Sequence, residues 1–123
     1  MVAFETDQPQ NLLTIRYSGS VVRDEVERGL EEVRAALAKL QSGFRLLADL
    51  TDLQSMEVAC APIIEKAMDM CNAKGTSMVV RVIPDPTRDI GLQIMSLFHY
   101  GDDVRIVTCE TLNEAKDILG AGS

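Results

Sequence analysis

Runs in which every second residue is hydrophobic alternate along this chain of 123 residues with runs of helical period. The strand-like runs predict strands at 2–6, 11–18, 44–50, 77–83 and 104–109. The helical runs predict helices at 23–41, from Val58 or Pro62 to Ala73, at 89–100 and at 112–120. Strands separated by helices pair in parallel through right-handed crossovers, whereas the first two runs can form an antiparallel hairpin. The pattern therefore predicts a single α/β domain over residues 1–123.

The predicted order of elements is β-β-α-β-α-β-α-β-α. This order implies a mixed, largely parallel sheet with the helices packed mainly on one face. The helix at 23–41 is the clearest, because Val26, Leu30, Val33 and Leu37 recur at helical spacing. We expect residues 51–56 to form a loop between the third strand and the second helix.

Alternate residues of the predicted strands divide into an apolar face and a mixed face. The mixed face carries one arginine on each of four strands: Arg16, Arg45, Arg81 and Arg105. One interpretation is a half-exposed sheet with arginine–aspartate pairs across its strands. The other is a partner surface or a homodimer interface, because arginine mixed with apolar side chains suits the core of an interface.

The charge of the chain excludes several classes of partner. A formal net charge of −7 repels phosphate backbones and anionic lipid surfaces, so we expect no nucleic-acid partner. No run of about 20 apolar residues predicts a membrane span. The first residues lack the basic and apolar regions of a signal peptide. These features predict a cytoplasmic protein.

Cysteine and histidine residues are too few and too scattered to predict chemistry. Cys60, Cys71 and Cys109 are widely spaced, which predicts buried, reduced thiols and no metal site. His99, the single histidine, would stabilise the C-terminus of the helix at 89–100. As a general base it would need a nucleophile and an orienting carboxylate beside it. We expect no cofactor and no enzymatic activity; a hydrolase or phosphotransferase is a third option behind the two hypotheses given below.

A candidate ligand site follows the fourth predicted strand. Asp85, Thr87, Arg88 and Asp89 lie where a strand ends and a helix begins, the edge at which α/β sheets usually bind ligands. Free N–H groups of the helix and the Arg88 guanidinium would suit an anion. The alternative is that Thr87 or Asp89 caps the helix and Asp85 forms a turn.

Two aspartates at the end of the third strand offer a second edge site. Asp49 and Asp52 flank Thr51 and could bind magnesium or orient a hydroxyl group. They could equally cap a turn and the following helix. No glycine-rich phosphate loop accompanies them, which counts against a nucleotide enzyme.

The element order and the segment FRLLADLTDL at 44–53, followed by a helix, resemble the STAS domain of bacterial anti-sigma-factor antagonists and of sulfate transporters. The likeness is closest to the divergent STAS-like group that is sometimes joined with Sec14-type lipid-binding domains. The resemblance implies a regulatory domain that binds a partner protein. In regulatory members a serine in an Asp-Ser motif is phosphorylated by a partner kinase, and the added charge controls docking.

The corresponding stretch here is Met56 to Cys60, which departs from that motif. Glu57 takes the acidic place and Val58 takes the place of the serine, so the phosphoacceptor is missing unless Ser55 or Thr51 serves from a shifted position. Our leading hypothesis is a non-enzymatic module that docks a regulatory partner through Ser55, Met56, Glu57, Val58 and Cys60.

The second hypothesis is a carrier of a lipid or another small apolar ligand, of the Sec14-like kind. It requires a cavity between the helices and the sheet, lined by Met68, Ile94, Met95 and Phe98.

Overall fold

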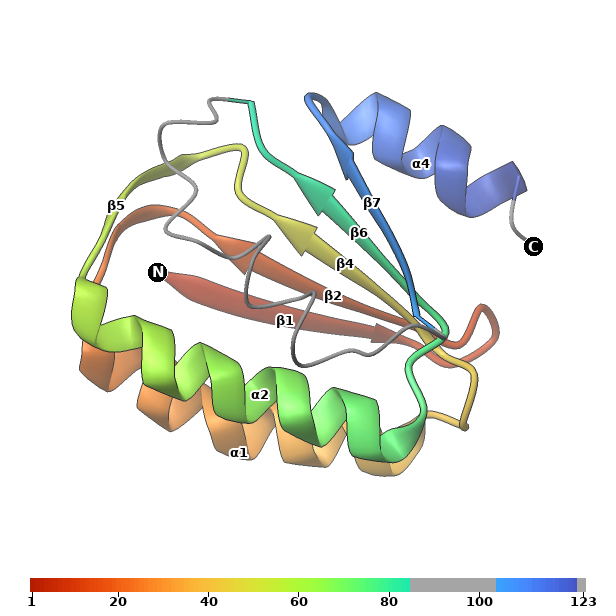
Figure 1. Ribbon diagram of the computed structural model, residues 1–123, viewed down its shortest axis with the longest axis horizontal. Coiled ribbons are helices and arrows are strands. Elements are labelled where there is room, and N and C mark those ends of the chain that lie inside the picture. Colours follow the sequence, from red (N-terminus) through yellow and green to blue (C-terminus); the bar gives the residue numbers. More distant parts are fainter. Residues whose placement is uncertain (85–103, 122–123) are drawn as a thin grey trace.

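A mixed sheet organises the part of the chain that the computed structural model describes, residues 1–84 and 104–121 (Figure 1). Five strands make up this sheet in the order β1-β2-β4-β6-β7. Their bounds are β1 Val2–Asp7, β2 Leu12–Tyr17, β4 Arg45–Asp49, β6 Met78–Val82 and β7 Arg105–Cys109. β1 pairs with β2 in antiparallel fashion, and the other neighbours pair in parallel. The predicted mixed, largely parallel sheet is confirmed.

The described helices lie mainly on one face of this sheet, as predicted. α1 (Arg23–Lys39) and α2 (Ala61–Lys74) lie side by side on that face, and a short 3-10 helix, η1 (Val58–Cys60), leads into α2 (Figure 1). α4 (Leu112–Ala121) packs on the other face against β6 and β7. The helix predicted at 89–100 lies outside the described residues. In the described part of the chain no helix is both long and apolar enough to cross a membrane.

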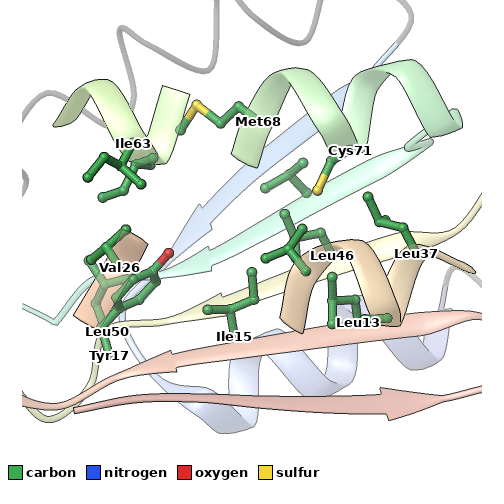
Figure 2. Close-up of a cluster of buried hydrophobic side chains, with 14 of the residues drawn as sticks. Leu13, Ile15, Tyr17, Val26, Leu37, Leu46, Leu50, Ile63, Met68 and Cys71 are labelled. Atoms are coloured by element: carbon green, nitrogen blue, oxygen red, sulfur yellow. The ribbon is translucent and has the colours of Figure 1, made fainter. Parts of the chain in front are cut away.

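The larger core fills the layer between the sheet and the pair α1 and α2 (Figure 2). Leu13, Ile15 and Tyr17 of β2 point into this layer, as the alternation of β2 predicts. The helices contribute apolar residues at helical spacing, among them Val26 and Leu37 of α1. A smaller cluster joins the other face of the sheet to α4 through Leu47, Met78, Val80, Val82, Cys109, Ala115 and Leu119.

The predicted assignment of strand faces is wrong for β6. Leu46 is in register with Val79, and Leu47 with Val80, so Val79 and Arg81 face α1 and α2. Because β6 is buried along its whole length, its apolar residues do not reveal which face is which. Arg81 is 2% exposed and donates to Thr108 Oγ1 at 2.7 Å. It thus lies on the opposite face from the other three arginines of the predicted stripe, Arg16, Arg45 and Arg105.

The loop predicted at 51–56 is partly wrong, because it contains a strand. β5 (Leu53–Met56) pairs in parallel with β3 (Gly19–Val21), the direct continuation of β2. The two strands form a separate small sheet beyond the carboxyl ends of β2 and β4. β5 contains the predicted partner-binding residues Ser55 and Met56, and the following η1 contains Val58 and Cys60. The small sheet and η1 together therefore position the candidate site.

Candidate functional site

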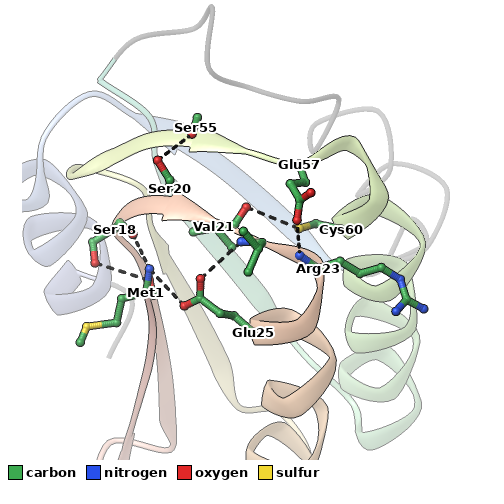
Figure 3. A network of polar contacts seen from close by, with 10 residues as sticks. Met1, Ser18, Ser20, Val21, Arg23, Glu25, Ser55, Glu57 and Cys60 are labelled. Carbon is green, nitrogen blue, oxygen red and sulfur yellow. Dashed lines mark hydrogen bonds and ion pairs between the residues drawn. The ribbon is translucent and has the colours of Figure 1, made fainter.

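The candidate site is a rim formed by β3, β5, η1 and the first residues of α1, which we call the β3–β5 rim (Figure 3). Its small sheet begins where the Gly19 N–H donates to the Asp52 carbonyl at 3.0 Å. Gly19 has a φ of 64°, a left-handed conformation that glycine adopts without strain. On the next residue pair, Ser55 Oγ donates to Ser20 Oγ at 3.1 Å. These contacts hold the two parallel strands β3 and β5 together at the edge of the molecule.

Glu57 joins three parts of the β3–β5 rim. Its backbone N–H donates to the Val21 carbonyl at 3.0 Å, which extends the pairing of β3 with β5. Its own carbonyl accepts the Cys60 N–H at 3.0 Å and so closes η1. Its Oε1 accepts the backbone N–H of Arg23, the first residue of α1, at 2.9 Å (Figure 3). Both the main chain and the side chain of Glu57 therefore form hydrogen bonds with other parts of the rim.

The predicted partner-binding residues differ in their solvent exposure. Val58, immediately after Glu57, is 82% exposed, more than the other exposed large hydrophobic residues that the structure describes. Ser55 and Glu57 are also exposed, whereas Met56 is partly buried and packs against the larger core. Cys60 is fully buried beneath this surface, so its side chain cannot contact a docking partner directly.

The thiol of Cys60 is held in its neutral form. Its Sγ lies 3.9 Å from the Val21 carbonyl oxygen. Burial raises the pKa of the thiol, and the negative charge of Glu57 raises it further. Because the thiolate is the reactive species, Cys60 has the environment of a structural cysteine.

A second polar cluster anchors the start of α1 to the main sheet (Figure 3). Glu25 Oε1 accepts the Val22 N–H at 3.3 Å, and Glu25 Oε2 lies 3.3 Å from the Met1 amino group. The Met1 amino group also donates to the Ser18 carbonyl at 2.5 Å. The Val22 N–H and the amino group lower the pKa of Glu25. Glu25 is three residues after Val22 and takes the N3 place of a capping box, whereas the contacts of Met1 with Ser18 and Glu25 join segments distant in sequence, which no local pattern reveals.

Asp49 and Thr51 form a turn. Asp49 Oδ1 accepts the Thr51 N–H at 3.0 Å and also the Thr51 hydroxyl group. Asp49 Oδ2 lies 3.4 Å from Arg16 Nε. Both carboxylate oxygens thus have protein partners, which favours the turn over a magnesium site. Within 1–84 and 104–121, no group of three or more histidine, cysteine or acidic side chains could hold a metal ion.

Asp85, Thr87, Arg88 and Asp89, the predicted ligand-binding residues, lie outside the described residues, and so does His99. The described part of that edge forms an open, polar hollow of about 420 Å³ beside the end of β4. Its wall includes Thr51, Asp52, Gln54 and Pro84.

The apolar cavity predicted around Met68 is small in the described part of the chain. Met68 lines a cavity of about 40 Å³ together with Tyr17, Ile64 and other core residues. Pockets for small ligands usually measure roughly 300–1,000 Å³. Ile94, Met95 and Phe98, the other predicted lining residues, lie outside the described residues.

Comparisons with solved structures place this arrangement among known folds. An uncharacterised protein of the DUF3478 family from Shewanella loihica PV-4, with a SpoIIAA-like fold, matches with a TM-score of 0.69 at 18% identity. The match covers 97% of this chain and 92% of that chain. The anti-sigma factor antagonist SpoIIAA in its unphosphorylated form matches with a TM-score of 0.66 at 15% identity, over 100% of both chains.

A serine-to-glutamate variant of RsbS from Moorella thermoacetica also matches, with a TM-score of 0.67 at 16% identity over 98% of this chain and 95% of that chain. No protein-family model matches the chain, and no curated protein matches it significantly. The chain has the SpoIIAA-like fold. The predicted resemblance to the STAS domain is confirmed at the level of the fold.

Proposed function

We propose that this chain is a non-enzymatic, cytoplasmic regulatory module that docks a partner protein through the β3–β5 rim. The SpoIIAA-like fold supports this proposal, because the solved structures that share it include an anti-sigma factor antagonist. The observation that carries the proposal is the 82% exposure of Val58 on a segment fixed by backbone and side-chain hydrogen bonds. Burying an exposed apolar side chain against a partner removes apolar surface from water, which favours the complex.

Position 58 also determines what kind of regulation we propose. The resemblance to regulatory STAS domains implies that Val58 takes the position of their phosphorylated serine, and valine has no hydroxyl group to phosphorylate. The module would therefore dock without a phosphoserine switch at this position. Its affinity would be set by apolar contact at Val58 and by the concentration of the partner.

A charge placed at position 58 tests this surface. We expect Val58→Asp to weaken binding of the partner at least about tenfold, because a buried carboxylate would replace an apolar contact. Folding should be unaffected, because Val58 is 82% exposed and its side chain is not part of the core. The partner is first captured by a photo-crosslinking residue at position 58 in lysate of the source cell, and its affinity is then measured by calorimetry.

Ala35→Asp is the matched control, because Ala35 is exposed on α1 away from the β3–β5 rim. It introduces the same charge and should leave the affinity unchanged. Equal affinity of the wild-type protein and Val58→Asp for the captured partner would contradict the proposed docking surface. So would an equal loss of affinity in Val58→Asp and Ala35→Asp.

A further inference from the structure

One N–H group of the first turn of α1 is capped by another segment of the chain. Val22 occupies the N-cap position, and its side chain has no oxygen to accept a hydrogen bond. The N–H of Arg23 belongs to the first turn, whose donors have no partner inside the helix. Glu57, 34 residues further along, supplies the acceptor at 2.9 Å. A carboxylate at this place also interacts favourably with the positive end of the helix dipole.

Each of the two residues joined by this hydrogen bond has an exposed valine as its neighbour in the sequence. Val22 precedes Arg23 and is 41% exposed, while Val58 follows Glu57 and is 82% exposed. The main chain of Glu57 is fixed by Val21 on one side and by Cys60 on the other. The hydrogen bond from the Arg23 N–H to the Glu57 side chain is thus a direct link between the start of α1 and the segment that carries Val58.

We propose that Glu57 is the positioning residue of the β3–β5 rim, which couples the N-terminus of α1 to η1 so that Val22 and Val58 are presented together. The part of this inference that concerns binding rests on the proposed function. The coupling itself is a property of the isolated protein. The Glu57 carboxylate acts through Arg23 and need not contact the partner.

The coupling is tested first in the protein alone, by amide hydrogen exchange and by methyl relaxation of Val58. We expect Glu57→Ala to speed exchange of the Arg23 amide about five- to tenfold, the change that corresponds to losing one helix cap. The order parameter of the Val58 methyl groups should fall in the same variant. Glu57→Gln keeps an oxygen that accepts the Arg23 N–H, so it should restore both readouts.

Ser55→Ala is the matched control on the same rim. It removes the hydroxyl group that bonds Ser20 but leaves the contact with α1 intact. We expect it to leave exchange of the Arg23 amide unchanged. Unchanged Arg23 exchange in Glu57→Ala, or an equal increase in Ser55→Ala, would overturn the coupling.

The second test uses the protein captured through position 58. We expect Glu57→Ala to weaken its binding about five- to tenfold and Glu57→Gln to bind nearly as the wild type does. An equal loss in both variants would overturn the positioning role, since it would show that the partner contacts the charge itself. If no partner is captured, the proposed function fails, while the exchange measurements still decide whether Glu57 couples the two elements.

Discussion

Gly75 ends α2 in a backbone conformation that strains other residues, and close to Ser42. Its φ of 105° lies in the left-handed region, and its N–H donates to the Cys71 and Asn72 carbonyls at 3.1 Å. A Cβ at this position would lie 2.3 Å from Ser42 Oγ. We expect Gly75→Ala to lower the free energy of unfolding by at least about 1–3 kcal/mol, the cost of backbone strain before the clash is added. Urea denaturation measures this loss.

Gly43 provides the control that separates strain from crowding. Its φ of 89° is also left-handed, but a Cβ there would meet no atom within 4 Å. Gly43→Ala should therefore carry the strain alone and destabilise the protein less than Gly75→Ala does. If the two variants lose the same free energy of unfolding, the contact with Ser42 does not contribute.

At the scale of elements, Arg45 of β4 links the C-terminal end of α4 to the sheet by a hydrogen bond. The arginine is buried on β4, and its Nη1 donates to the Leu119 carbonyl at 2.5 Å. Its Nη2 donates to the Gln10 carbonyl in the turn between β1 and β2 at 3.2 Å. One side chain thus bridges the last turn of α4 and the hairpin.

We expect Arg45→Leu to loosen α4 selectively and to cost about 1.5–3 kcal/mol, because charged hydrogen bonds to two carbonyl groups are lost. Hydrogen exchange followed by mass spectrometry should show faster exchange in 112–121 and little change in α1, which belongs to the other core cluster. Arg45→Lys should restore only part of the protection, since a lysine cannot reproduce the forked geometry. Uniform acceleration across both helices would contradict a local role.

The sequence was informative about elements whose pattern is regular. The hairpin, the parallel order and α1 follow from clear periods of two and of about 3.6 residues. β3 and β5 were missed because strands of three and four residues with exposed serines carry too little alternation to be distinguished from a loop. The facing of β6 was predicted wrongly because a strand buried on both sides has no polar face to mark it.

The candidate site was predictable only in part, for a related reason. Val58 is exposed, as a docking residue has to be, and its role in binding a partner stays a prediction. The cap between Glu57 and Arg23 had no signal in the sequence, since the usual signature is a polar side chain directly at the start of a helix. Contacts between distant segments depend on how the elements pack, and hydrophobic periodicity does not specify individual polar pairs.

At the scale of the whole molecule, weak acids are buried on both faces of the sheet. Tyr17 and Cys60 belong to the core under α1 and α2, and Cys109 belongs to the core under α4. Burial raises the pKa of all three groups. Nearby carboxylates raise the pKa of the thiols further, Glu57 at Cys60 and Glu114 at Cys109. The folded protein therefore binds these protons more tightly than the unfolded chain does.

This difference predicts a loss of stability in alkali. Below the ordinary thiol pKa of 9.0 both states are protonated and the contribution of these groups is complete. As the pH rises above that value, the unfolded chain releases protons that the folded protein retains, so the free energy of unfolding falls. The midpoint of urea denaturation should thus be constant from about pH 7 to 8 and decline from about pH 9 upward.

Tyr17→Phe isolates one contributor, because the ring stays in the core and only the ionisable hydroxyl group is removed. Above the ordinary tyrosine pKa of 10.0 this variant should lose stability less steeply with pH than the wild-type protein, whereas between about pH 7 and 8 the two slopes should agree. A wild-type midpoint that does not fall up to about pH 10.5 would contradict the prediction. Identical slopes in the two proteins above pH 10.0 would show that Tyr17 ionises as easily in the folded state as in the unfolded chain.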